Sequence, residues 1–148
     1  MSSNSRLCVA AHVLTWMAVD QRDPATVATS QRIAVSVNTN PVVIRRCLGL
    51  LREAGLVQSR RGAGAGWDLT REPGSITLLD VHLAVGEDEP LIGLHRSSPS
   101  SSCPVGSGIQ PALRQVFGRL DEAVRRELAS TTIADMVRDV LAQQPATA

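Results

Sequence analysis

The chain has 148 residues and is 43% hydrophobic, but it has one Phe, two Trp and no Tyr, so it can form a single domain with an aliphatic core. It has no apolar run of about 18 residues, which excludes a membrane span, and no signal-peptide cleavage pattern. Its three cysteines are widely spaced, which excludes a disulfide framework. Together these features predict a cytoplasmic protein. Residues 1–75 carry nine Arg against five Asp and Glu, or +4, and residues 76–148 carry six against nine, or −3, so we expect the first half to bind phosphates.

Apolar residues at helical spacing predict a first helix over residues 5–19, which ends before a polar segment at residues 20–24. Cys8 and His12 lie one turn apart on this helix and could begin a metal site. Two ligands do not complete such a site, so we interpret them as a small core thiol and a histidine at the edge of the core.

A helix, a tight polar turn and a second helix come next. Thr29 or Ser30 can cap the first of these helices, which ends near Val37. Asn40 is a good N-cap and Pro41 fits the first helical position, so the second helix begins there and extends to about residue 54. Its pattern predicts a buried face and a basic outer face, with Ile44, Cys47, Leu48 and Leu51 inside and Val42, Arg45, Arg46, Gly49 and Arg52 outside.

A basic, glycine-rich segment between two short strands predicts a hairpin. Gly55 ends the preceding helix, residues 56–58 form a strand, residues 60–66 (RRGAGAG) form the turn, and residues 67–70 form the partner strand. A nucleotide-binding glycine loop would be followed by a helix, and here a strand follows, so we do not expect nucleotide binding. Two helices, a strand, a hairpin turn and a second strand in this order predict a winged helix.

The second half of the chain predicts a short helix, a long loop and a long helix. Residues 77–86 form the short helix, and residues 87–106 form an acidic and serine-rich loop. A helix that begins between Ser107 and Pro111 carries an apolar stripe over about 20 residues, or roughly 30 Å, which a small winged helix cannot bury, so we expect a dimer seam. Thr132 and Asp135 have the spacing of a capping box for a last helix. The stripe comprises Ile109, Leu113, Val116, Phe117, Leu120, Val124 and Leu128.

We therefore expect a mainly α fold with a small two-stranded β-wing, organised in three parts. Residues 1–86 would be a winged helix-turn-helix DNA-binding domain, residues 87–106 a loop of the kind that senses a signal, and residues 107–148 a dimerisation helix followed by a C-terminal helix.

Residues 30–69 and 76–85 resemble the Rrf-two family of bacterial transcription regulators. The most specific matching segments are residues 40–46 (NPVVIRR), residues 54–57 (AGLV), the wing glycines, and residues 76–78 (ITL) leading into residues 80–81. The resemblance implies a homodimer built through the long helix. It also implies that the two recognition helices enter successive major grooves of a palindromic operator in double-stranded DNA, while the wings touch the minor grooves.

The residues that would contact DNA lie on the recognition helix, on the wing and at helix N-termini. Val42, Arg45 and Arg46 are near the start of the recognition helix, and Arg45 is the first choice for a base contact because arginine can pair bidentately with guanine. On the wing we expect Arg60 and Arg61 near minor-groove phosphates, with Arg61 favoured by the resemblance. Three polar residues at helix N-termini could donate to phosphates: Ser30, Thr39 and Asn40. The alternative for each is a solvated arginine or a simple cap.

The loop before the long helix bears on the signal to which such a protein would respond. Members of the family that bind an iron–sulfur cluster carry three cysteines in the loop before the long helix, and this chain has only Cys103 there, so we expect no metal and no cofactor. Cys103 precedes a predicted helix N-terminus, which lowers a thiol pKa, so its oxidation could act as a redox switch. The alternative is a loop cysteine without a regulatory role.

An enzyme is the competing class, and the motifs do not favour it. The three histidines have no Ser, Cys or carboxylate at motif spacing, and no phosphate-binding loop, metal triad or carboxylate pair is present in the sequence. We therefore predict a sequence-specific DNA-binding transcriptional regulator that acts as a homodimer. The remaining alternative is a module on the same fold that binds a protein or a small ligand, with DNA binding secondary.

Overall fold

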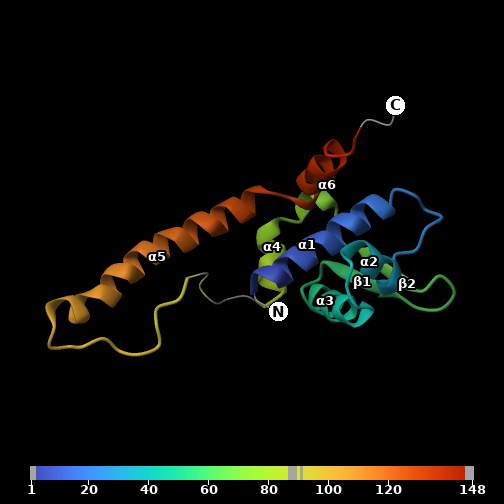
Figure 1. The fold of residues 1–148 in the computed structure, drawn as a ribbon. Coiled ribbons are helices and arrows are strands. Elements are labelled where there is room, and N and C mark those ends of the chain that lie inside the picture. The colour runs from blue at the N-terminus through green and yellow to red at the C-terminus, as the bar shows by residue number, and fades with distance from the viewer. Residues whose placement is uncertain (1–2, 87–89, 91, 146–148) are drawn as a thin grey trace.

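The computed structural model describes residues 3–86, 90 and 92–145. Helices dominate this part of the chain, and the two strands form one antiparallel hairpin in which Val57 pairs with Leu69 and Arg60 pairs with Gly66 (Figure 1). The predicted fold class, mainly α with a two-stranded wing, is therefore confirmed. The elements in chain order are α1 (Ser3–Asp20), α2 (Ser30–Val37), α3 (Pro41–Glu53), β1 (Val57–Arg60), β2 (Gly66–Leu69), the 3-10 helix η1 (Pro73–Ser75), α4 (Leu78–Ala84), α5 (Pro104–Ser130) and α6 (Ile133–Ala142).

Local capping signals account for where α2 and α3 begin and end. The Thr29 hydroxyl accepts the N–H of Arg32 at 3.2 Å, and the Asn40 side-chain oxygen accepts the N–H of Val42 at 2.9 Å. Between the two helices, Asn38 adopts the left-handed conformation with φ 57°, which turns the chain within three residues. These contacts confirm the predicted helix–turn–helix.

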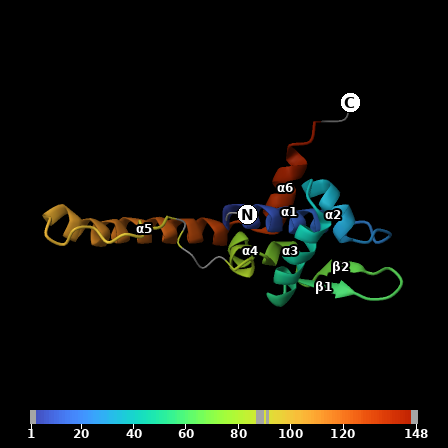
Figure 2. The ribbon, with the colours of Figure 1, turned by 60° about the horizontal axis from the view of Figure 1, so that its bottom comes forward.

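The core is aliphatic, as predicted, and α1 lies at its centre. Figures 1 and 2 show α1 between α6 on one side and α3 with the wing on the other. Val13, Leu14 and Met17 of α1 are fully buried against residues from every neighbouring helix. Ile133 and Val137 of α6 belong to this same core, so α6 packs as part of the winged helix. None of the described helices is long and apolar enough to cross a lipid bilayer.

Helices α4 and α6 begin side by side in the same way. Thr77 and Asp80 form a capping box at the start of α4, and Thr132 and Asp135 form a second one at the start of α6. The two capping threonines pair as an antiparallel bridge, and the N–H of Ile133 donates to the carbonyl of Ile76 at 2.9 Å. This arrangement fixes the C-terminal helix to the winged helix after α5 has left it.

The long helix α5 projects away from the rest of the molecule (Figures 1 and 2). It begins at Pro104, with Cys103 as N-cap, so the predicted start between Ser107 and Pro111 is wrong. Pro104 satisfies the preference for proline at the first helical position, and Pro111 lies inside the helix instead of at its start. The predicted loop is correspondingly shorter, and its residues 87–89 and 91 lie outside the described residues. The proposed division into three parts stays a prediction.

Two smaller expectations about the first half need correction. Cys8 is exposed, so it is not the core thiol that the helical pattern suggested. The helix on which it lies starts two residues earlier than predicted and ends one later. The Nε2 atom of His12 lies 2.9 Å from the hydroxyl of Ser36 on α2, so His12 joins α1 to α2 and does not form a ligand pair with Cys8.

Candidate nucleic-acid interface

The recognition helix α3 separates its apolar and basic residues between two faces. Ile44, Cys47, Leu48 and Leu51 are buried, which confirms the predicted inner face. The outer face carries exposed side chains, among them Arg45, Arg46, Arg52 and Val42, the last of which is 43% exposed. A basic helix face of this kind suits the floor and walls of a major groove.

Helix α2 is held against α1, and this contact keeps the helix–turn–helix rigid. The Arg32 guanidinium forms an ion pair with Asp20 at 2.6 Å, donates to the carbonyl of Val27 at 2.6 Å, and lies over the Trp16 ring at 5.0 Å from its centroid. Arg32 is therefore a structural arginine. Because it already has three partners, it is a poor choice for a DNA contact.

The two predicted wing arginines differ in their surroundings. Arg60 lies at the end of β1 and not in the turn, and its Nε forms an ion pair with Asp68 of β2 at 2.5 Å, which raises the pKa of Arg60 through the hydrogen bond and the charge of Asp68. Arg61 begins the turn and is exposed, and no hydrogen bond or ion pair joins it to the described residues. Arg61 is thus the free cation of the wing, and Arg60 serves mainly to hold the hairpin.

The turn end of the wing is joined to the segment before α2 and to α3. The Trp67 N–H donates to the carbonyl of Ala28 at 2.8 Å, and the Arg52 guanidinium lies 6.0 Å from the centroid of the Trp67 ring. Gly66 is required here, because a Cβ at this position would collide with Val27 and with the carbonyl oxygen of Ala28. These contacts place Arg61 on a hairpin of fixed orientation relative to α3.

The three predicted phosphate contacts at helix N-termini are unequal. Ser30 is only 7% exposed and its hydroxyl lies 3.3 Å from the Gln31 side chain, so little of it remains for a phosphate. Asn40 is exposed, although its side-chain oxygen already caps α3. Thr39, which is half-buried in the turn, and Asn40 border the N-terminus of α3, where backbone N–H groups favour an anion.

The cysteines that could sense a signal lie in contrasting surroundings. Burial raises the pKa of the Cys47 thiol to about 11, in agreement with its predicted structural role. Cys103 is exposed at the start of α5, and the backbone N–H groups of Gly106 and Val105 near its thiol lower its pKa. Cys103 is therefore the more reactive thiol of the two.

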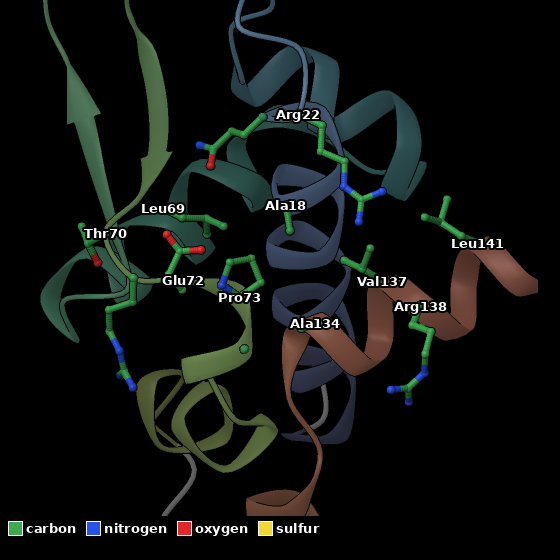
Figure 3. A pocket seen from close by; sticks show the side chains of 13 residues that line it. Ala18, Arg22, Leu69, Thr70, Glu72, Pro73, Ala134, Val137, Arg138 and Leu141 are labelled. Atoms are coloured by element: carbon green, nitrogen blue, oxygen red, sulfur yellow. The ribbon is translucent and has the colours of Figure 1, made fainter.

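A cleft of about 950 Å³ lies on the other side of the winged helix, between the end of α1, the base of the wing and α6 (Figure 3). Apolar side chains such as Ala18 and Val137 line it together with four charged residues. Arg71 and Arg138 are paired with neighbouring aspartates. Arg22 and Glu72 have no such partner among the described residues. The alternative function predicted from the sequence, binding of a small ligand, would place that ligand in this cleft.

The whole of this architecture belongs to a known class. A family model described as "Iron-dependent Transcriptional regulator", Rrf2, matches residues 3–139, and the chain belongs to this family of transcriptional regulators, the Rrf-two family. The predicted family and the predicted regulatory role are thereby confirmed.

Particular relatives support the same conclusion. The chain is 42% identical over 134 residues to the putative HTH-type transcriptional regulator YwnA of Bacillus subtilis, covering 90% of this chain and 96% of YwnA. It is 33% identical to the HTH-type transcriptional regulator CymR of the same species, covering 70% of this chain and 67% of CymR. A crystal structure of a putative DNA binding protein, 39% identical, superposes with a TM-score of 0.67 and covers 88% of this chain and 97% of that one.

The iron in the family's description does not fit the residues described in this chain. No group of three or more His, Cys, Asp or Glu side chains comes together in residues 3–86, 90 and 92–145. Cys47 is a buried, protonated thiol in the recognition helix, whereas Cys103 is exposed at the start of α5. A cluster held by thiolates would need ligands that these two cysteines cannot supply together.

Proposed function

We propose that this regulator is a cytoplasmic homodimer that binds a palindromic operator in double-stranded DNA and has no enzymatic activity. Arg45 reads bases, with Val42 and Arg46 beside it on α3. Arg61 of the wing binds the flanking minor groove, and Thr39 and Asn40 bind phosphates at the start of α3. The observation that carries the proposal is that the exposed basic face of α3 is held rigidly beside a wing whose turn carries a free arginine.

The dimer in this proposal is formed through α5. None of the described α5 residues is buried within one chain, and Val116 and Leu120 of its apolar stripe are more than 40% exposed. Two copies that pair along this stripe would remove it from water and place two recognition helices on one duplex. Half-sites related by a two-fold axis follow from that symmetry.

The salt dependence of DNA binding tests the proposal. A duplex is first selected from a random-sequence library by the wild-type protein, and its dissociation constant is then measured at several salt concentrations. Because each phosphate contact releases counterions, we expect the logarithm of the association constant to fall linearly with the logarithm of salt, with a slope of several units. Failure to select any sequence, or a slope near zero, would contradict the proposal and favour a ligand- or protein-binding role centred on the cleft near Arg22.

We propose that Cys103 is the site of a response to oxidants, because its pKa is lowered and it lies at the start of the helix that would join the protomers. Oxidation to a sulfenic acid, a mixed disulfide or a disulfide between protomers would change the packing of α5 and hence the spacing of the recognition helices. DNA binding is titrated with hydrogen peroxide for the wild type and for Cys103→Ser. Equal sensitivity of the two proteins would rule out this role.

A further inference from the structure

Gly49 in the recognition helix has no structural explanation, unlike the other glycines of the helix–turn–helix and wing. Five glycines lie between Ser30 and Thr70, and the structure describes all of that segment. Three of them, Gly55, Gly62 and Gly64, have φ between 74° and 84°, which favours glycine. A side chain at Gly66 would collide with residues 27 and 28. Gly49 has ordinary helical backbone, and a Cβ there would meet no atom within 4 Å.

A glycine at this place weakens the helix that carries it. Glycine is among the least favourable residues in a helix interior, because it loses more backbone freedom on folding than alanine does. Gly49 lies nine residues into the 13-residue α3, well inside its hydrogen-bonded part. Since no atom of the described residues would meet a side chain there, we look for the reason outside the chain.

The position of Gly49 on α3 indicates what that reason is. Gly49 follows Arg46 by three residues, Arg45 by four and Val42 by seven, so all four lie on the outward side of the helix. The buried residues Cys47 and Leu48 point the opposite way. Gly49, itself half-buried, therefore leaves the outer face of α3 without a side chain one turn after the two arginines proposed to meet DNA.

We propose that Gly49 is the point at which α3 approaches the major groove most closely, and that its missing side chain sets the depth at which Arg45 and Arg46 reach the base edges. This inference rests on the proposed DNA binding. The major groove is about 12 Å wide and a helix with its side chains is about 10–12 Å across, so the fit leaves little room for an added group. A side chain at Gly49 would hold the helix outward and shorten the reach of both arginines.

The test uses Gly49→Ala and Gly49→Leu, because both residues favour helix and differ in size. We expect both variants to keep or raise the melting temperature, by about 3 °C for alanine. Affinity for the duplex selected by the wild type should fall by about tenfold for alanine and on the order of 100-fold for leucine. Binding to a scrambled duplex, which depends on phosphate contacts, should change by less than about twofold.

Gly118→Ala in α5 is the matched control. Gly118 also lies inside a helix, a Cβ there would also meet no atom within 4 Å, and it lies off the apolar stripe of α5. It should raise the melting temperature in the same way and leave DNA binding unchanged.

Two results would overturn the inference while leaving the proposed function intact. One is a Gly49→Leu variant that binds the selected duplex as tightly as the wild type. The other is a Gly49→Ala variant that is less stable than the wild type, which would show that Gly49 is needed for folding. A wild-type protein that selects no duplex would instead remove the proposed function itself.

Discussion

The winged helix buries its large apolar side chains, whereas the long helix α5 leaves its own exposed. In the winged helix, Leu14, Ile33, Leu48 and Ile76 are essentially inaccessible to water, and residues from α6 complete the same core. No α5 residue that the structure describes is buried, and its Val105 is 70% exposed. The winged helix covers its own apolar surface, whereas α5 leaves its apolar stripe exposed, as the proposed dimer requires.

After α5, the chain returns to the winged helix through contacts of α6. With 27 residues, α5 is about 40 Å long, which carries its start far from the core. The antiparallel bridge between Thr77 and Thr132 brings the chain back and seats Ile133 in the core. The end of α5 is thus attached to the winged helix, and in the proposed dimer a change in the packing of α5 would reach the recognition helix through this attachment.

The largest effect, on the free energy of unfolding, is expected where α5 joins the winged helix. Ile133→Ala should lower the free energy of unfolding by about 3 kcal/mol, because it opens a cavity beneath the bridge to α4. Urea unfolding followed by circular dichroism measures this change. Val140→Ala on the same helix is the control, since Val140 is 45% exposed and should cost less than about 1 kcal/mol. Equal costs would show that α6 is not part of the core.

A charge on the apolar stripe of α5 tests the other region. Leu120→Glu should separate the dimer, because a carboxylate would be buried in the seam, and operator affinity should fall by about 100-fold through loss of the second half-site. Light scattering gives the oligomeric state and a gel-shift titration gives the affinity. Gln115→Glu, which lies off the stripe, should change neither. A Leu120→Glu protein that remains dimeric would exclude α5 as the seam.

The thiol of Cys47 offers a way to measure burial in the winged helix by pH. The chain has no Lys and no Tyr, so its cysteines are the main groups that titrate between about pH 9 and 11. The folded-state pKa of Cys47, about 11, is above its unfolded value, so its contribution to stability is present below about pH 8.5 and is lost as pH rises toward 11.

We therefore expect the free energy of unfolding of the wild type to decrease by on the order of 1 kcal/mol between pH 8 and pH 10. The Cys47→Ala variant, although less stable overall, should lose less over that range. Cys103→Ser should show a decrease at least as large as that of the wild type, because the lowered pKa of Cys103 contributes in the opposite direction. A decrease that persists in Cys47→Ala would show that this thiol is not shielded from water in solution.

Short-range signals allowed the winged helix to be predicted from the sequence. Asn40 and Pro41 fix the start of α3 by contacts within two residues, and Gly55 ends the helix through its positive φ. The inner and outer faces of α3 follow from helical spacing alone. Such signals act within one element, and the structure preserves them because the tertiary contacts agree with them.

Features that depend on pairing between elements could not be predicted in this way. The ion pair of Arg60 with Asp68 requires the register of the hairpin, and a strand predicted to end at residue 58 placed Arg60 in the turn. The predicted start of α5, between Ser107 and Pro111, is wrong because Pro111 also suits the first helical position, whereas the helix begins at Pro104. The close start of α4 and α6 joins residues 55 positions apart, which no local pattern reveals.

The smallest effect is expected on the wing, and it sharpens which face of the winged helix meets DNA. Arg61→Ala should weaken operator binding by several-fold at physiological salt and lower the salt slope by about one per protomer, because one phosphate contact is lost. Arg22→Ala is the matched control: it removes an equally exposed cation without a partner among the described residues, but from the cleft beside α6. If both variants weaken binding equally, the loss in Arg61→Ala is caused by the lower net charge of the protein and not by a lost contact of the wing. A loss confined to Arg61→Ala requires that the wing itself lies against the duplex.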